Sequence, residues 1–248
     1  MKNVFFYDSL ESTNVTAKDM ANIGTEHGTV IIANSQTAGR GRYGRSFYSP
    51  SGHGLYMSII LHTTKFRLST PALLTLFSAV AVCRVIENVS NISPKTKWVN
   101  DIFVDGKKVC GILTEAVSML ESSDIHYMIV GIGINLTTPD AIFPDELKNI
   151  AGSLFKSNNP PVTRDKIAFE IIQQFLSAGE HIDEVKMLDE YKQKMFLLGK
   201  KITVSFPGSH SDAFDAIAID VDNTGRLVVQ KENGEIMSLH NGDITTKY

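Results

Sequence analysis

Cysteine is scarce in this sequence of 248 residues, which contains only Cys83 and Cys110. Two cysteines in apolar surroundings cannot build the disulfide framework of a small secreted domain or a multi-thiolate zinc site. Long apolar runs are also missing at the N-terminus, where the first such run, residues 4–7, is too short for a signal-peptide core or a membrane helix. We therefore expect a cytoplasmic protein that has no membrane partner.

The sequence lacks low-complexity tracts and any excess of basic charge. Its 24 Lys and Arg residues against 27 Asp and Glu give a formal net charge of −3, so nothing globally basic points to DNA or RNA. Charged residues make up 21% and apolar residues 43%, which excludes a disordered chain and allows a sizeable core. The length predicts one large domain, or a large domain with a small one.

Strands and helices are interleaved up to residue 198. Runs rich in β-branched and aromatic residues predict strands at 4–7, 28–34, 55–61, 102–104, 108–116 and 125–135. Helices are expected after Ser12, after Thr70-Pro71, from Thr163, and over 181–195. Asp105-Gly106 is typical of a hairpin turn. This pattern predicts an α+β fold.

The pattern changes after Gly199. Four short strands are expected at 201–206, 214–221, 226–230 and 235–239. Turn signals separate them at Pro207-Gly208, Asn223-Thr224-Gly225 and Asn233-Gly234. The spacing predicts a small C-terminal β-barrel of about 50 residues. We place the boundary near 198, which gives domains 1–198 and 199–248.

A loop rich in glycine and arginine interrupts the pattern at residues 35–54. Its centre, GRGRYGR at 39–45, combines glycines that expose backbone N–H groups with arginines whose donors match carboxylate and phosphate oxygens. A mobile surface loop and an RGG-like nucleic-acid segment are the alternatives. One compact loop in an acidic chain argues against an RNA tail, so the loop predicts an anion site.

Two further segments carry weaker signals. KWVND at 97–101 leads into the hairpin that carries Lys108, but Asn and Asp at a turn are usually structural, and Trp98 is expected in the core. GIGIN at 131–135 places two glycines inside a strand, which indicates close backbone approach or simple packing. It is not a dinucleotide-binding fingerprint, and the P-loop pattern is absent.

Taken in order, these segments resemble the signature series of biotin–protein ligases. The series is STN at 12–14, Gln36 with GRGRYGR, KWVND, GKKVCGILTE at 106–115, and GIGIN. The resemblance covers essentially the whole chain, and five motifs in register are far more specific than any one. The chain resembles the form of these ligases without an N-terminal DNA-binding domain, because the roughly ten residues before Ser12 are too few for a helix-turn-helix.

The resemblance implies a mixed sheet flanked by helices, similar to class II aminoacyl-tRNA synthetases, followed by an SH3-like β-barrel. It also implies a two-step reaction. The carboxylate of biotin attacks the α-phosphate of ATP, giving biotinyl-5′-AMP and pyrophosphate; the ε-amine of an acceptor lysine then displaces AMP. Mg²⁺ accompanies ATP. The implied acceptor is a biotin carboxyl carrier protein or domain of a biotin-dependent carboxylase. No DNA partner is expected, and a homodimer is allowed.

The resemblance assigns roles residue by residue. The catalytic residues are Lys108, Arg40 and Asp101. The biotin-binding residues are Ser12, Thr13, Asn14, Gln36, Gly39, Arg40, Gly41, Arg42, Lys108, Gly111, Gly131 and Gly133. The ATP and adenylate residues are Arg40, Arg42, Arg45, Asn100, Lys108 and Asn135; no metal ligand is assigned. Lys108 offsets repulsion between the carboxylate and the phosphate, and Asp101 orients or deprotonates the acceptor lysine.

The sequence departs from the family pattern at three positions. Val99 replaces a proline, and Tyr43 and Phe47 stand where some relatives have arginine and tryptophan. Three alternatives remain: a lipoate–protein ligase, whose pocket would suit an apolar dithiolane instead of a polar ureido ring; a binding protein without turnover; and an RNA-binding protein, which charge and the lack of paired stacking aromatics disfavour. Loss of ATP turnover on removing Lys108 would separate an enzyme from a binder.

Overall fold

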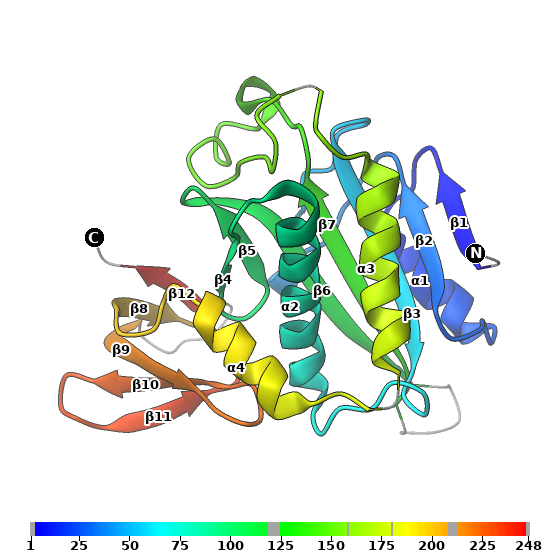
Figure 1. Cartoon of the computed structure of the whole chain (residues 1–248). Coiled ribbons are helices and arrows are strands. Elements are labelled where there is room, and N and C mark those ends of the chain that lie inside the picture. Colours follow the sequence, from blue (N-terminus) through cyan, green and yellow to red (C-terminus); the bar gives the residue numbers. More distant parts are fainter. Residues whose placement is uncertain (1–2, 119–124, 158, 180, 208–212, 247–248) are drawn as a thin grey trace.

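The computed structural model describes residues 3–118, 125–157, 159–179, 181–207 and 213–246. Its main layer is a seven-stranded sheet in the order β1-β2-β3-β7-β6-β5-β4 (Figure 1). The strands are β1 (Val4–Tyr7), β2 (Thr29–Ala33), β3 (Gly54–His62), β4 (Lys95–Lys97), β5 (Asp101–Val104), β6 (Lys107–Ser118) and β7 (Ile125–Asn135). The β1–β2 pair is parallel and the other neighbouring pairs are antiparallel. The expected α+β class with a mixed sheet is confirmed.

Helices cover both faces of this sheet, because successive side chains of a buried strand point to opposite faces. On β2, Val30 and Ile32 belong to the main core with α2 (Pro71–Ser90), α3 (Arg164–Ala178) and α4 (Glu184–Lys194). Ile31 between them packs on the other face, against α1 (Thr13–Asn22). The fourth helix is shorter than the expected 181–195.

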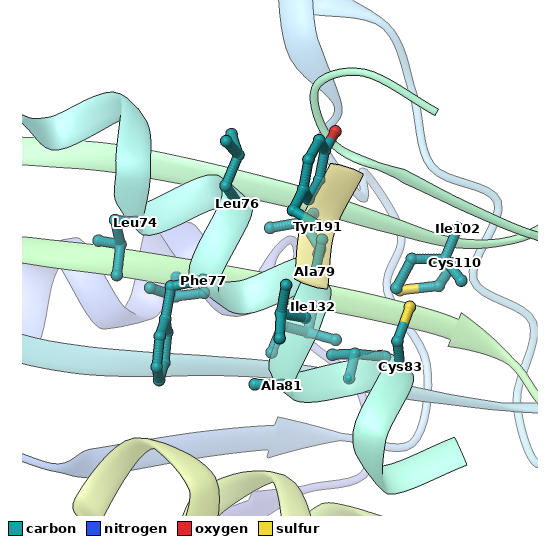
Figure 2. Close-up of a cluster of buried hydrophobic side chains, with 14 of the residues drawn as sticks. Leu74, Leu76, Phe77, Ala79, Ala81, Cys83, Ile102, Cys110, Ile132 and Tyr191 are labelled. Atoms are coloured by element: carbon teal, nitrogen blue, oxygen red, sulfur yellow. The ribbon is translucent and has the colours of Figure 1, made fainter. Parts of the chain in front are cut away.

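The central helix α2 is apolar nearly all round. It begins after Thr70 with Pro71 in its first turn and ends at Ser90, which is followed by Asn91 with a φ of 56°. Its length and composition would suit a membrane span, but 72% of the apolar window is buried inside the protein, as in a core helix. Figure 2 shows this core, with the sulfur atoms of Cys83 on α2 and Cys110 on β6 facing each other as free thiols.

The C-terminal strands form a second, antiparallel sheet in the order β11-β10-β9-β8-β12 (Figure 1). They are β8 (Lys201–Ser205), β9 (Phe214–Val221), β10 (Leu227–Lys231), β11 (Ile236–Leu239) and β12 (Asp243–Thr246). The sequence predicted four of them and missed β12, a four-residue strand with one buried apolar residue. The turn expected at Pro207-Gly208 falls partly outside the described residues.

The expected SH3-like barrel is not confirmed. A barrel needs its first and last strands to pair, but among the described strands β11 and β12 lie at opposite edges of an open sheet. The open sheet is joined to the larger one through a shared core and through Trp98, whose Nε1 donates to Gly225 O at 3.0 Å. The domain boundary near residue 198 stays a prediction.

Candidate active site

A cavity of about 610 Å³ lies where the start of α1, strands β5 to β7, the glycine–arginine loop and the C-terminal sheet meet. All of the predicted site residues except Gly39 line it: Ser12, Thr13, Asn14, Gln36, Arg40, Gly41, Arg42, Arg45, Asn100, Asp101, Lys108, Gly111, Gly131, Gly133 and Asn135. Residues spread between positions 12 and 135 of the sequence therefore converge on one cavity.

The first turn of α1 forms a neutral polar pocket at one end of the cavity. Ser12, Thr13 and Asn14 are all buried, and Ser12 caps the helix by position without a side-chain capping bond. The backbone N–H of Thr13 donates to Gln36 Oε1 at 2.8 Å, and Gln36 Nε2 donates to Ser49 Oγ at 2.8 Å. These two bonds set the orientation of the Gln36 carboxamide, with its oxygen towards Thr13 and its nitrogen towards Ser49.

Two side chains that sequence reasoning missed hold Asn14 in place. Asn14 Nδ2 donates to Glu115 Oε2 at 2.7 Å, and the fully buried Ser58 hydroxyl lies 2.6 Å from Asn14 Oδ1. Strand register makes this possible, since Ser58 pairs with Gly131 and Glu115 lies on the neighbouring strand β6. Glu115 ends the GKKVCGILTE segment but was given no role, and no local signal in the sequence marks Ser58.

The strand glycines make room for side chains of the protein itself. A Cβ at Gly131 would lie 2.2 Å from Asn14 Oδ1, and one at Gly133 would lie 2.6 Å from the ring of Phe47. A Cβ at Gly111 would also crowd the Phe47 ring, at 3.2 Å. Gly131 and Gly133 were predicted to bind biotin, with close approach or packing as the reason for glycine. The structure places the side chains of Asn14 and Phe47 against them, which accounts for the glycines by close approach.

The arginine loop, residues 39–45, folds back on itself beside the cavity. Gly41 N donates to Arg45 O at 2.7 Å, and Phe47 N donates to Gly39 O at 2.8 Å. A Cβ at Gly39 would lie 2.5 Å from Phe47 O, so this glycine allows the loop to close even though it does not line the cavity. Tyr43 at the loop tip has a φ of 56°.

The three arginines of the loop have different partners. Arg40 Nη2 lies 3.1 Å from Glu11 Oε1 on the exposed side. Arg42 Nη1 donates to Asn100 Oδ1 at 3.2 Å, which joins the loop to the KWVND segment. The guanidinium of Arg45 pairs with the carboxylate of Asp243 in the C-terminal sheet. The predicted cations therefore meet at the cavity, but each is already oriented by a partner.

Lys108 and Asp101 form the central ion pair. Lys108 Nζ lies 2.6 Å from Asp101 Oδ1, and each side chain is about a quarter exposed, at 27% and 23%. Apart from this ion pair, Asp101 Oδ1 has no hydrogen-bond partner among the described residues. A register shift between Ile102 and Phe103 in the β5–β6 pair accompanies this arrangement.

Lys97 is a further cation at the cavity that the sequence did not single out. Burial lowers the pKa of Lys97, and the neighbouring Lys108 and Arg45 lower it further, whereas Asp101 and Asp243 raise it. Basic side chains outnumber carboxylates among the lining residues: Arg40, Arg42, Arg45, Lys97 and Lys108 against Asp101, Glu146 and Asp243. This excess of positive charge favours an incoming polyanion. Gly242, Asp243, Ile244 and Thr245 of the C-terminal sheet also line the cavity, which no pattern in the sequence indicated.

Asn135 supplies a buried, unused acceptor. Its side chain is 5% exposed, and Nδ2 donates to Gly152 O at 3.1 Å. Asn135 Oδ1 has no hydrogen-bond partner in the described part of the chain. Buried polar atoms are normally satisfied, so this oxygen points to a ligand. Among the described residues no group of three or more His, Cys, Asp or Glu side chains could hold a metal ion by itself.

Known proteins resemble this chain in both sequence and structure. Residues 6–135 match the model of the Biotin/lipoate A/B protein ligase family. The Bifunctional ligase/repressor BirA of Bacillus subtilis is 35% identical over 98% of this chain and 74% of its own length. The Biotin--[acetyl-CoA-carboxylase] ligase of Mycobacterium tuberculosis is 26% identical over 94% of this chain and 85% of its own length.

Among solved structures, the biotin protein ligase of Aquifex aeolicus in complex with biotin and ATP superposes with a TM-score of 0.81. It is 25% identical and covers 100% of this chain and 99% of its own. The biotin protein ligase of Leishmania major in complex with biotinyl-5-AMP, at 24% identity and a TM-score of 0.65, shares the fold over 97% of this chain and 100% of its own. The family match and these relatives show that the chain belongs to the biotin/lipoate A/B protein ligase family.

Proposed function

We propose that this protein is a biotin protein ligase, which activates biotin with ATP to biotinyl-5′-AMP and transfers it to a lysine of a biotin carboxyl carrier protein or domain. One observation carries the proposal. A single cavity joins a neutral polar pocket at Thr13 and Asn14 to a cationic centre at Lys108 and Arg42. A ligand with an uncharged polar head, an apolar chain and a terminal carboxylate fits this order of surfaces.

The pocket at α1 suits the ureido ring of biotin. Ser12, Thr13, Asn14 and Gln36 present short polar groups whose orientation is fixed by Ser49 and Glu115. Such preorganised groups favour a ligand with both donors and acceptors over an apolar ring, which would leave them unpaired. The floor made by Gly111, Gly133 and the Phe47 ring then suits the aliphatic chain that leads to the carboxylate.

In the first step the biotin carboxylate attacks the α-phosphate, a C–O–P anhydride forms, and pyrophosphate leaves. Two anionic groups must approach closely, which costs several kcal/mol, roughly 4 at an effective dielectric constant of 20. Lys108 offsets this repulsion, and Asp101 holds the Lys108 ammonium in place until the substrates arrive. Arg40 and Arg42 cover the adenylate, which excludes water that would hydrolyse it.

ATP brings Mg²⁺ as its substrate metal. Mg²⁺ commonly takes one or two protein oxygens together with phosphate oxygens and water. Asn135 Oδ1 is a buried oxygen without a partner among the described residues, and Asn100, whose Oδ1 accepts from Arg42, lines the same cavity. These amide oxygens fit a site that receives the metal with the nucleotide.

In the second step the acceptor lysine amine attacks the acyl carbon of biotinyl-5′-AMP. The C–N bond forms, the bond between the acyl carbon and the phosphate oxygen breaks, and AMP leaves. The amine must lose a proton, and we assign Asp101 to accept it because Lys108 is the only partner of its Oδ1 among the described residues. Domains 1–198 and 199–248 and a cytoplasmic location are further parts of the proposal, which allows a homodimer without requiring one. The free buried cysteines are consistent with a reducing compartment.

Pyrophosphate release from ATP, with biotin or lipoate as the acid, tests the proposal. We expect release with biotin, and a fall of about 100-fold or more for Lys108→Ala, the scale on which removing one oriented donor to a developing charge acts. Release with lipoate alone would identify a lipoate ligase, the other activity named by the family. Biotin binding without release would identify a binding protein.

A further inference from the structure

The tip of the arginine loop contacts the C-terminal sheet at two points. The backbone N–H of Gly242 donates to the hydroxyl oxygen of Tyr43 at 3.0 Å. The Arg45 guanidinium pairs with the carboxylate of Asp243, the first residue of β12. Both contacts join residues nearly 200 positions apart in sequence, and Arg45, Gly242 and Asp243 line the cavity.

Inside the loop, the same tyrosine orients an arginine that lines the cavity. Arg42 Nη2 donates to Tyr43 Oη at 2.8 Å, and the Arg42 guanidinium lies 4.8 Å from the centre of the Tyr43 ring. Arg42 Nη1 then reaches Asn100 Oδ1 at 3.2 Å. A continuous series of contacts therefore runs from the start of β12 through Tyr43 and Arg42 to the KWVND segment.

We propose that Tyr43 and Asp243 are positioning residues that fasten the arginine loop to the C-terminal sheet and so set how often the cavity opens. Fastening of the loop does not depend on the reaction. Its consequence, slower escape of the adenylate from the cavity, rests on the proposed ligase function.

The chemistry of position 43 supports this assignment. A tyrosine hydroxyl accepts from both Gly242 and Arg42, whereas a phenylalanine at this position could make neither hydrogen bond. Backbone bonds within the loop and the contacts of Arg40 with Glu11 and Arg42 with Asn100 also hold it. Its tip has few buried contacts, because Tyr43 is 42% exposed and Arg45 is also exposed. A loop with few buried contacts opens easily. The contacts of Tyr43 and Arg45 with the C-terminal sheet are therefore expected to raise the fraction of molecules in which the loop is closed.

Limited digestion with trypsin measures loop opening directly, since Arg40, Arg42 and Arg45 are the cleavage sites of the loop. The full chain without ligand is compared with Tyr43→Phe, Asp243→Asn and the double variant. Each single change is expected to raise the rate of cleavage in the loop about twofold to tenfold, the range for one partly exposed hydrogen bond or ion pair. The two effects are expected to multiply, with melting temperatures unchanged.

Asp220→Asn is the matched control. Asp220 belongs to the same sheet and pairs with Lys192 of α4 at 2.7 Å, away from the cavity. This variant is expected to leave loop cleavage at the wild-type rate. Equal cleavage of Tyr43→Phe and wild type, or an equal rise in Asp220→Asn, would overturn the proposal.

The second readout is the dissociation rate of biotinyl-5′-AMP formed on the full-length enzyme. Tyr43→Phe and Asp243→Asn are expected to release it about twofold to tenfold faster, again in proportion to loop opening. If the wild type makes no adenylate, the ligase function is refuted. The trypsin experiment still tests whether Tyr43 and Asp243 hold the loop against the C-terminal sheet. Faster cleavage with unchanged adenylate release would show that the loop does not control escape.

Discussion

The carboxamide of Asn14 occupies space that only a glycine at position 131 leaves free, and Gly131→Ala tests that arrangement. The new methyl carbon would lie 2.2 Å from Asn14 Oδ1, so Asn14 must leave both Ser58 and Glu115. A hydrogen bond to a charged group contributes about 1.5–3 kcal/mol and a neutral one about 0.5–1.5 kcal/mol. The displaced side chain therefore loses hydrogen bonds that together contribute roughly 2–4.5 kcal/mol to holding it in its binding orientation. If this energy is lost from biotin binding, the affinity falls by about 30-fold or more.

A double-mutant cycle separates this steric effect from a general loss of stability. Biotin affinity is measured by titration calorimetry for wild type, Gly131→Ala, Asn14→Ala and the double variant. In the Asn14→Ala background the shortened side chain vacates the space, so adding Gly131→Ala is expected to change affinity by less than about 0.5 kcal/mol. Two fully additive losses would refute the reasoning, because they would mean that the two positions act independently.

Two other predictions concern groups outside the cavity. Burial, followed by the charges of His62 and Lys65, lowers the pKa of His27 below 6.5. The unfolded state then binds more protons than the folded state. The free energy of unfolding is therefore highest above pH 6.5 and falls as the pH drops below it. Urea midpoints of wild type and His27→Gln are expected to converge towards pH 5, and parallel curves would contradict this assignment. Burial raises the pKa of Cys83 to about 12 and that of Cys110 well above its usual value, so neither thiol is expected to react with a disulfide reagent until the protein unfolds; rapid labelling of the native protein would contradict it.

Sequence patterns predicted the elements whose local signals are strong. The apolar helix after Thr70-Pro71, the alternating strands and the Asp105-Gly106 hairpin are all present because propensity and tertiary packing agree there. The short strands β4 and β12 were missed, since three or four mostly polar residues give no periodic signal. Local patterns also cannot show whether the C-terminal strands close into a barrel, because closure depends on pairing between the two edge strands.

For the site, the sequence by itself determined which segments meet at the cavity: the turn at Ser12, the arginine loop, the hairpin with Lys108 and the strand with Asn135 all line it. Only the tertiary structure decided how these groups are held. Glu115 and Ser58 orient Asn14, and Asp243 orients Arg45, through contacts that depend on strand register and on how the two sheets pack. Such partners lie far apart in sequence and carry no spacing rule, so their pairing is fixed by the folded chain and not by any local pattern.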